Sequence, residues 1–140
     1  MELTPALAWA AKRSNAVLIT LRADGRPQSS DVSYTVDDTT FVISVTADRA
    51  KTINMMRDPR VVLHITEPGE WSYLSFDGVA ELSAPAADPG DATADALVAY
   101  YEAVAGKPHP DWDEYRAAMV SEQRLLVRLT PGSVVGQIRS

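Results

Sequence analysis

The sequence contains no cysteine and only two histidines. The absence of cysteine excludes disulfide bonds, thiolate nucleophiles, cysteine-ligated zinc and iron–sulfur clusters. His64 and His109 lie far apart in the sequence and do not have the spacing of a metal-ligand pair. We therefore expect no metal site, and any redox chemistry requires a bound organic cofactor.

Positive charge and long apolar runs are also scarce. The chain has 13 Lys and Arg residues against 19 Asp and Glu, a formal net charge of −6, with no basic stripe to offset it. Such a surface repels a phosphate backbone, so we expect no nucleic-acid partner. No apolar run approaches membrane-spanning length, and the N-terminal residues lack the basic region and apolar core of a signal peptide. We expect a cytoplasmic protein with no membrane partner.

Turn signals between β-rich runs predict an antiparallel sheet. Asp24-Gly25 lies between two apolar runs and predicts a β-hairpin, and Asp77-Gly78 predicts a second one. Thr4-Pro5 predicts a helix start with Thr4 as its N-cap. The segment "RLLVRLTPGSVVGQI" predicts a last strand, interrupted at its Pro-Gly.

Helical patterns lie between these strands. Two helices are expected in an insertion over about residues 85–123, one of them with Asp111 as N-cap. With 140 residues the chain has the length of one domain, and we expect a single domain over residues 1–140. The predicted fold is α+β: six or seven antiparallel strands forming a small barrel or half-barrel, with three or four peripheral helices.

The stretch "TADRAKTINMMRDPRVVL" places two cations at the start of a predicted short helix. A cation in the first helical turn is unfavourable, whereas the free N–H groups and the dipole there attract an anion. One interpretation is that Arg49 and Lys51 hold a phosphate group, helped by the hydroxyls of Thr46 and Thr52. The other is that Asp48 caps the helix and balances Arg49 while Lys51 is solvated. The charge pattern leaves both open.

Three longer segments carry a resemblance to a known family. "AVLITLRADGRPQSSDVSY", "FVISVTADRAKTINMMRDPRVVLHI" and "WSYLSFDGVAEL" together resemble the pyridoxamine 5′-phosphate oxidase-like superfamily, specifically its small F420-dependent oxidoreductases. The resemblance runs through nearly the whole chain. It implies a split β-barrel of the FMN-binding type that works as a homodimer and binds flavin or deazaflavin at the subunit interface, with a small-molecule substrate.

The resemblance also assigns residues to the cofactor. It implies that Arg49 and Lys51 contact the cofactor phosphate. The strand after the Asp-Gly turn would approach the ring through Pro27, Gln28, Ser29 and Ser30. The ribityl chain would lie along Ser44, Val45 and Thr46. Trp71 and Tyr73, expected on one face of the fifth strand, would come near the cofactor of the opposite subunit.

Each assignment has a structural alternative. Gln28, Ser29 and Ser30 are equally typical of the polar face of an edge strand. Trp71 and Tyr73 are also typical of packing or dimer-interface anchors.

The resemblance favours coenzyme F420 over FMN and an F420H2-dependent reductase that transfers hydride to an electron-poor acceptor such as an enone or quinone. No catalytic side chain is then required, because the cofactor performs the hydride transfer. F420 carries a phospholactyl and polyglutamate tail, and Arg57 and Arg60 could extend the basic track toward it, although Asp58 lies between them. Two alternatives stay open: a non-catalytic F420-binding or storage protein, and an FMN-dependent oxidase.

Overall fold

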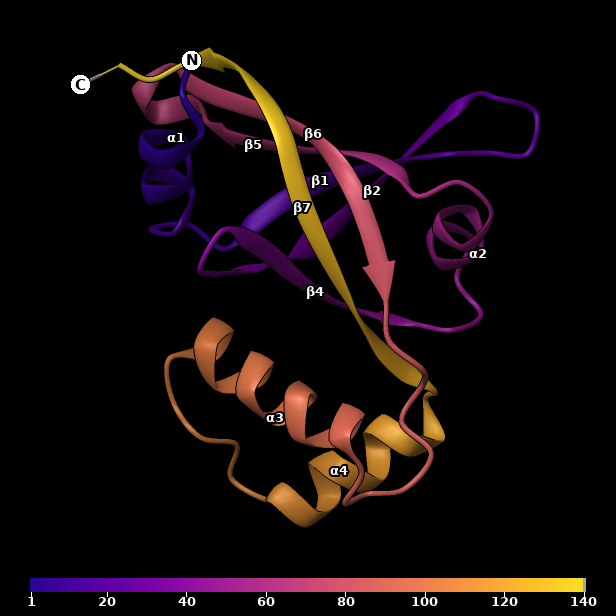
Figure 1. The fold of residues 1–140 in the computed structure, drawn as a ribbon. Coiled ribbons are helices and arrows are strands. Elements are labelled where there is room, and N and C mark those ends of the chain that lie inside the picture. Colours follow the sequence, from indigo (N-terminus) through magenta and orange to yellow (C-terminus); the bar gives the residue numbers. More distant parts are fainter. Residues whose placement is uncertain (140) are drawn as a thin grey trace.

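A computed structural model describes residues 1–139 and shows one seven-stranded antiparallel sheet with the order β2-β1-β5-β6-β7-β4-β3. The sheet curls into a half-barrel (Figure 1). The strands are β1 (Asn15–Leu21), β2 (Pro27–Ser33), β3 (Thr35–Asp37), β4 (Thr40–Thr46), β5 (Arg60–Glu67), β6 (Ser72–Leu82) and β7 (Arg124–Gln137). The predicted α+β split-barrel fold is confirmed.

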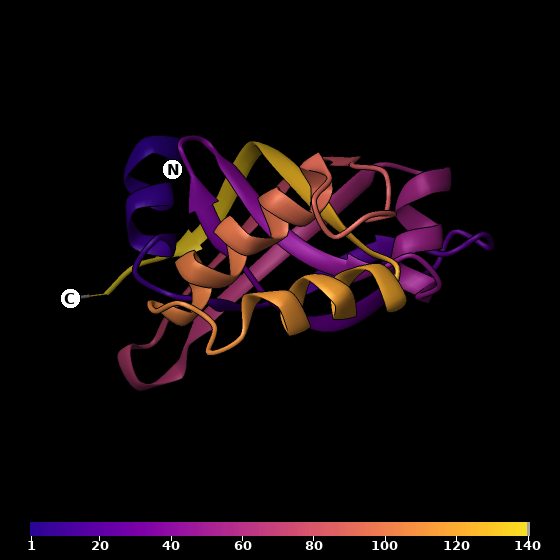
Figure 2. The same ribbon diagram turned by 90° about the horizontal axis from the view of Figure 1, so that it is seen from below.

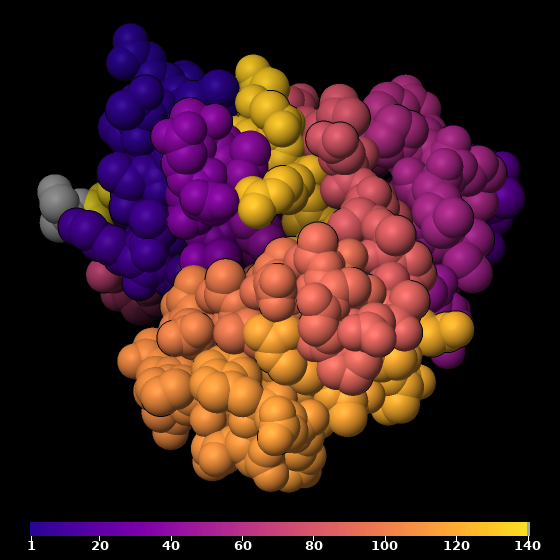
Figure 3. Space-filling model, turned by 60° about the horizontal axis from the view of Figure 1, so that its bottom comes forward, coloured from indigo at the N-terminus to yellow at the C-terminus, as the bar shows by residue number. Residues whose placement is uncertain are grey.

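Four α-helices and one 3₁₀ turn complete the fold. They are α1 (Leu3–Ala10), α2 (Ala50–Arg57), α3 (Ala92–Ala105), α4 (Trp112–Ser121) and η1 (Pro68–Glu70). Helices α3 and α4 form the insertion between β6 and β7 and lie across one side of the sheet (Figures 1 and 2). In the space-filling view the insertion packs closely against the barrel (Figure 3). Within the described residues no helix is long and apolar enough to cross a membrane.

The helix cap predicted at Asp111 is confirmed, the one predicted at Thr4 is wrong, and a further cap at Asp91 was not predicted. Asp91 accepts a hydrogen bond from the backbone N–H of Ala94 (2.8 Å) at the start of α3, and Asp111 serves α4 in the same way. Helix α1 begins earlier than predicted: its N-cap is Glu2, and Thr4-Pro5 lies inside the first turn. Pro5 is tolerated there because the first N–H groups of a helix have no partner within the helix.

The β4 strand separates two apolar clusters. Phe41, on its barrel side, packs edge-on against Phe76 with ring centroids 4.8 Å apart. Val42, on the other side, packs with Leu97, Met119 and other residues under the helical insertion. Because side chains alternate along a strand, Ser44 and Thr46 share the side of Val42 that faces the insertion.

The second predicted hairpin is wrong. Asp77-Gly78 does not turn the chain; β6 runs straight through it, and the register against β7 shifts there so that Gly132 has no opposite residue. A Cβ on Gly78 would overlap the carbonyl oxygen of Thr130 on the neighbouring strand. This glycine permits close approach of two backbones at a bulge, which has the same sequence signature as a turn.

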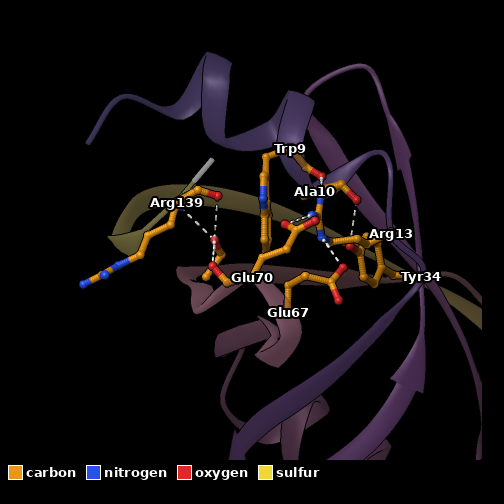
Figure 4. Close-up of polar contacts among 8 residues, drawn as sticks. Trp9, Ala10, Arg13, Tyr34, Glu67, Glu70 and Arg139 are labelled. Atoms are coloured by element: carbon orange, nitrogen blue, oxygen red, sulfur yellow. Dashed lines mark hydrogen bonds and ion pairs between the residues drawn. The ribbon is translucent and has the colours of Figure 1, made fainter.

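Helix α1 is fastened to the sheet by a cluster that we call the α1 corner, formed by Trp9, Arg13, Glu67 and Glu70 (Figure 4). The guanidinium of Arg13 lies 3.7 Å from the centroid of the Trp9 ring. It also donates to the Glu67 carboxylate at 3.0 Å, to the Glu70 carboxylate at 3.1 Å and to the Trp9 carbonyl at 2.8 Å. The cation in this corner is fully matched by partners within the chain.

Candidate functional site

The site predicted from the charge pattern lies where β4 ends and α2 begins. Arg49 is the N-cap of α2, with extended backbone angles and no side-chain hydrogen bond to the helix. Asp48 therefore does not cap the helix, and within residues 1–139 it forms no ion pair with Arg49. The alternative in which Asp48 caps the helix and balances Arg49 is therefore wrong on both contacts.

Three cations gather at this point. Within the described part of the chain neither Arg49 nor Lys51 forms an ion pair. Burial lowers the pKa of Lys51, and the nearby guanidinium groups of Arg49 and Arg124 lower it further, against a smaller opposing effect of Asp31. Arg124 is paired with Glu122 at 3.0 Å, whereas the positive charge at Arg49 and Lys51 has no ion-pair partner in the described residues, which favours the binding of an anion there.

Lys51 lines a hollow of about 480 Å³ between the margins of the split barrel. One margin is the end of β2, at Asp31, Val32 and Ser33, and the other is β4, at Ser44. The insertion forms the far wall with Tyr100, Tyr101, Tyr115 and Met119, and Glu122 and Arg124 complete the lining. The Tyr100 hydroxyl donates to the Ser33 carbonyl at 2.9 Å. We call this space the Lys51 hollow.

Two predicted contacts point into the protein instead of into the hollow. Val45 is 1% exposed and belongs to the barrel core. Thr52 is fully buried, and its hydroxyl donates to the carbonyl of Thr46 at 2.7 Å. Both side chains lie behind the surface of the site, so only the backbone of these residues is placed for the predicted contacts with a cofactor.

The hydroxyl of Thr46 lies on the side of β4 that faces the insertion. Its oxygen is buried and has no hydrogen-bond partner within residues 1–139. A buried hydroxyl without a partner is uncommon in folded proteins and marks a position where a bound group or water is expected. Thr46 stays a predicted ligand contact, although its hydroxyl is enclosed by protein atoms and the residue does not line the Lys51 hollow.

The four residues predicted to approach the ring divide between the two faces of β2. Gln28 and Ser30 are half-buried, whereas Pro27 and Ser29 are exposed on the opposite face. The side chain of Gln28 is held by Asn54, whose Nδ2 lies 3.1 Å from the Gln28 Oε1 and 3.1 Å from the hydroxyl of buried Thr20. Only one face of β2 can line a single binding surface, so at most one of these pairs contacts the ring in the predicted way.

Trp71 and Tyr73 lie away from the Lys51 hollow. Trp71 is 75% exposed, has a left-handed backbone (φ 54°) and ends the 3₁₀ turn before β6 begins, so it is not on a strand as predicted. Tyr73 is 43% exposed on the outer side of the sheet, next to His64. The fold does not bring these two side chains together with Lys51 within one chain.

Arg124 and the tyrosines of the insertion are site residues that were not predicted from the sequence. Arg124 is the first residue of β7 and pairs with Thr46 on β4. Its Nη1 lies 3.3 Å from the Ser44 hydroxyl. Arg124 is far from Ser44 in the sequence, and only the register between β4 and β7 brings the two residues together. No local sequence motif at Arg124 predicts this contact.

Comparison with known proteins adds the family. A family model described as pyridoxamine 5′-phosphate oxidase matches residues 3–136. The chain belongs to this family. Among solved structures, this chain is similar to the conserved hypothetical protein Rv2991 from Mycobacterium tuberculosis. The two share 22% sequence identity and superpose with a TM-score of 0.77, over 99% of this chain and 85% of that one.

Two further solved structures share the pyridoxamine 5′-phosphate oxidase fold and differ in their described roles. One is an F420 reductase, with 22% identity and a TM-score of 0.66 over 91% of this chain and 94% of that one. The other is the heme storage protein HutZ from Vibrio cholerae, with 18% identity and a TM-score of 0.67 over 99% and 96%. The fold is shared at these identities, and the ligand has to be argued from the residues of this chain.

The residues around the Lys51 hollow fit the phosphate of a flavin-type cofactor of the kind bound in the pyridoxamine 5′-phosphate oxidase family. Arg49 and Lys51 supply positive charge at the start of α2, and Arg124, paired with Glu122, adds a further cation in the same space. Thr46 has a buried hydroxyl without a partner in the described residues. The hydroxyl of Ser44 lies beside Arg124 at the edge of the same space. This donor set is suited to phosphate or carboxylate oxygens.

Proposed function

We propose that this protein is an F420H2-dependent oxidoreductase that reduces an electron-poor small molecule such as an enone or quinone. The observation that carries the proposal is the positive charge of Lys51 and Arg124, which line a hollow in the split of the barrel, together with that of Arg49 near Lys51. Arg49 and Lys51 lack an ion pair within residues 1–139. A cofactor with an anionic tail supplies the missing negative charge. F420H2, when bound, supplies a hydride.

The chain's own residues have positioning roles in this proposal. Arg49 and Lys51 hold the cofactor phosphate, and Thr46 donates to one of its oxygens. Asn54 fixes Gln28 by a hydrogen bond of 3.1 Å, which gives the neighbouring part of β2 a defined polar surface. No side chain is assigned the transfer of a proton.

We further propose that the active form is a homodimer with the cofactor at the subunit interface. The outer side of the sheet carries apolar side chains that a single chain leaves exposed, including Tyr73, Val79 (53%) and Val135 (65%). A second hollow of about 400 Å³ shares Asp31, Val32 and Ser33 with the Lys51 hollow and extends toward His64. An apolar face beside such a hollow is suited to a second copy that completes the binding site.

Side-by-side equilibrium binding tests the cofactor. The protein, freed of bound small molecules and held in phosphate-free buffer, is titrated with F420, FMN and hemin, the last because HutZ shares this fold. We expect F420 to bind most tightly. A yellow protein that prefers FMN would support an oxidase of the FMN type, and preference for hemin would support heme binding; either result contradicts the proposal.

Turnover then separates an enzyme from a storage protein. We expect oxidation of F420H2, followed by its absorbance, to accelerate in the presence of at least one member of a panel of enones and quinones. Tight F420 binding with no acceleration across the panel would instead support the non-catalytic alternative. Sedimentation at micromolar concentration tests the homodimer independently of both results.

A further inference from the structure

The basic track does not continue along α2 as the sequence suggested. Arg60 pairs with Asp58 through two contacts, at 3.0 and 2.8 Å. Arg57 donates to the carbonyl of Leu21 at 2.6 Å and to the side chain of Asn54 at 3.1 Å. Both cations are committed within the chain, so neither is well placed to bind a long anionic tail.

Arg124 provides positive charge in another direction. It lies on the side of β7 that faces the helical insertion and lines the Lys51 hollow from the strand opposite β4. Its side chain is 31% exposed, so it is partly shielded from water yet open to the hollow. Its contact with Ser44 fixes the guanidinium at the margin of the hollow.

A carboxylate already occupies the position next to this guanidinium. Glu122 also lines the hollow, and its Oε1 lies 3.0 Å from the Arg124 Nε. Glu122 and Arg124 are two residues apart at the exposed junction of α4 and β7, and exposed pairs of this kind contribute little free energy. A ligand carboxylate that arrives through the hollow can replace Glu122 at small cost.

We propose that Arg124, across the hollow from the phosphate position at Lys51, forms a second anion-binding position under the helical insertion, which takes the carboxylate-bearing tail of F420. This inference rests on the proposed function. In F420 the phosphodiester carries a lactyl group joined by an amide to glutamyl residues, whose carboxylates place further negative charge beyond a phosphate held at Arg49 and Lys51. FMN ends at its phosphate and leaves this position without a ligand group. Arg124 is thus a specificity-determining residue that favours the tailed deazaflavin.

Three variants test the position by equilibrium binding of F420 and of FMN. Arg124→Gln removes the charge and keeps a donor near Ser44, and we expect F420 affinity to fall about tenfold, as for the loss of one charge-assisted contact, with FMN affinity unchanged within about twofold. Glu122→Gln frees the guanidinium and should strengthen F420 binding by about two- to threefold. Arg128→Gln is the matched control, because Arg128 lies on the same strand and pairs with Asp37 away from the hollow.

The outcomes separate this inference from the proposed function. Equal weakening of F420 and FMN by Arg124→Gln would assign Arg124 to the phosphate and overturn the tail position. Unchanged F420 binding in both the Arg124 and Glu122 variants, in protein that binds F420 normally otherwise, would overturn it while leaving the proposed function intact. Failure of the unmodified protein to bind any deazaflavin would overturn both. The Glu122 substitution alters an exposed side chain and keeps the test decisive even where Arg124→Gln impairs folding.

Discussion

The α1 corner and the Lys51 hollow both contain partly buried cations, but they differ in whether those cations have negatively charged partners within the chain. In the α1 corner the single cation, Arg13, is 16% exposed and has two carboxylates, a carbonyl and an aromatic face as partners. In the Lys51 hollow the cations repel one another, and Arg49 and Lys51 lack any ion pair within residues 1–139.

The difference separates charge that holds the fold from charge that awaits a ligand. A buried cation is tolerated when its partners offset the cost of desolvation. Cations that lower the pKa of a neighbouring lysine, as Arg49 and Arg124 do for Lys51, weaken the fold. Such an arrangement is typical of functional sites, where a ligand provides the compensating charge. Substitutions in the α1 corner should therefore lower folding stability, whereas substitutions of the cations at the Lys51 hollow should mainly lower ligand affinity.

The largest effect on stability is expected for Arg13→Ala. It leaves Glu67 and Glu70 without their shared cation and uncovers the Trp9 ring. We expect a loss of about 2–3 kcal/mol in the free energy of unfolding, measured by urea denaturation. Arg22→Ala is the control, because Arg22 pairs with Asp24 in an exposed hairpin and should cost less than about 0.5 kcal/mol. Similar losses for both variants would contradict a structural role of the α1 corner.

Lys51→Ala should lower ligand affinity and leave folding stability intact. We expect F420 binding to weaken by about 1.5–3 kcal/mol, the range for a charge-assisted contact, without loss of folding stability. Fluorescence titration of F420 measures the affinity. Lys107→Ala removes the same charge from an exposed loop and should leave the affinity unchanged. Equal affinity of the Lys51 variant and the unmodified protein would remove Lys51 from the site.

Asn54 connects the fold to the site, and Asn54→Ala should affect both moderately. The substitution removes the donor to buried Thr20 and to Gln28 and the acceptor for Arg57. We expect a loss of about 1–2 kcal/mol in stability from the unpaired buried hydroxyl, and a smaller decrease in F420 affinity than for Lys51→Ala. Asn15→Ala, at an exposed position on β1, serves as the control for stability. A folded Asn54 variant with unchanged stability would show that water replaces the amide.

Local sequence chemistry accounts for most of the fold. Alternating apolar residues, the Asp24-Gly25 turn and the Asp91 and Asp111 caps each act over a few residues, and the structure has them where such signals place them. Asp77-Gly78 failed as a predictor because its glycine is required by a carbonyl on another strand, at Thr130. A sequence signal is ambiguous where the constraint comes from a non-local backbone contact.

Only the part of the candidate site that depends on the electrostatic field at the start of α2 could be predicted from the sequence. Arg49 and Lys51 could be identified because the start of a helix makes a cation unfavourable there. Arg124 could not, because its approach to Ser44 depends on the register between β4 and β7. The sequence also did not reveal that the side chains of Val45 and Thr52 point into the core while those of Ser44 and Lys51 face the hollow.

The smallest effect is a gain in stability of the ligand-free protein when Lys51 is replaced by Met. The lowered pKa of Lys51, ordinarily 10.5, means that the folded protein holds this proton less tightly than the unfolded chain. Charged Lys51 therefore weakens the fold at neutral pH, and the penalty disappears as pH rises through the lowered pKa toward 10.5.

We expect Lys51→Met to raise the melting temperature by about 1–4 °C at pH 7 in phosphate-free buffer, with the gain shrinking near pH 10. Thermal melts of the variant and the unmodified protein at both pH values measure the difference, which isolates Lys51 from other groups that titrate there. Added F420 should reverse the order, because only the unmodified protein uses the lysine to bind it. A lower melting temperature for the variant at both pH values would place Lys51 with the structural charges of the α1 corner and end the contrast between the two regions.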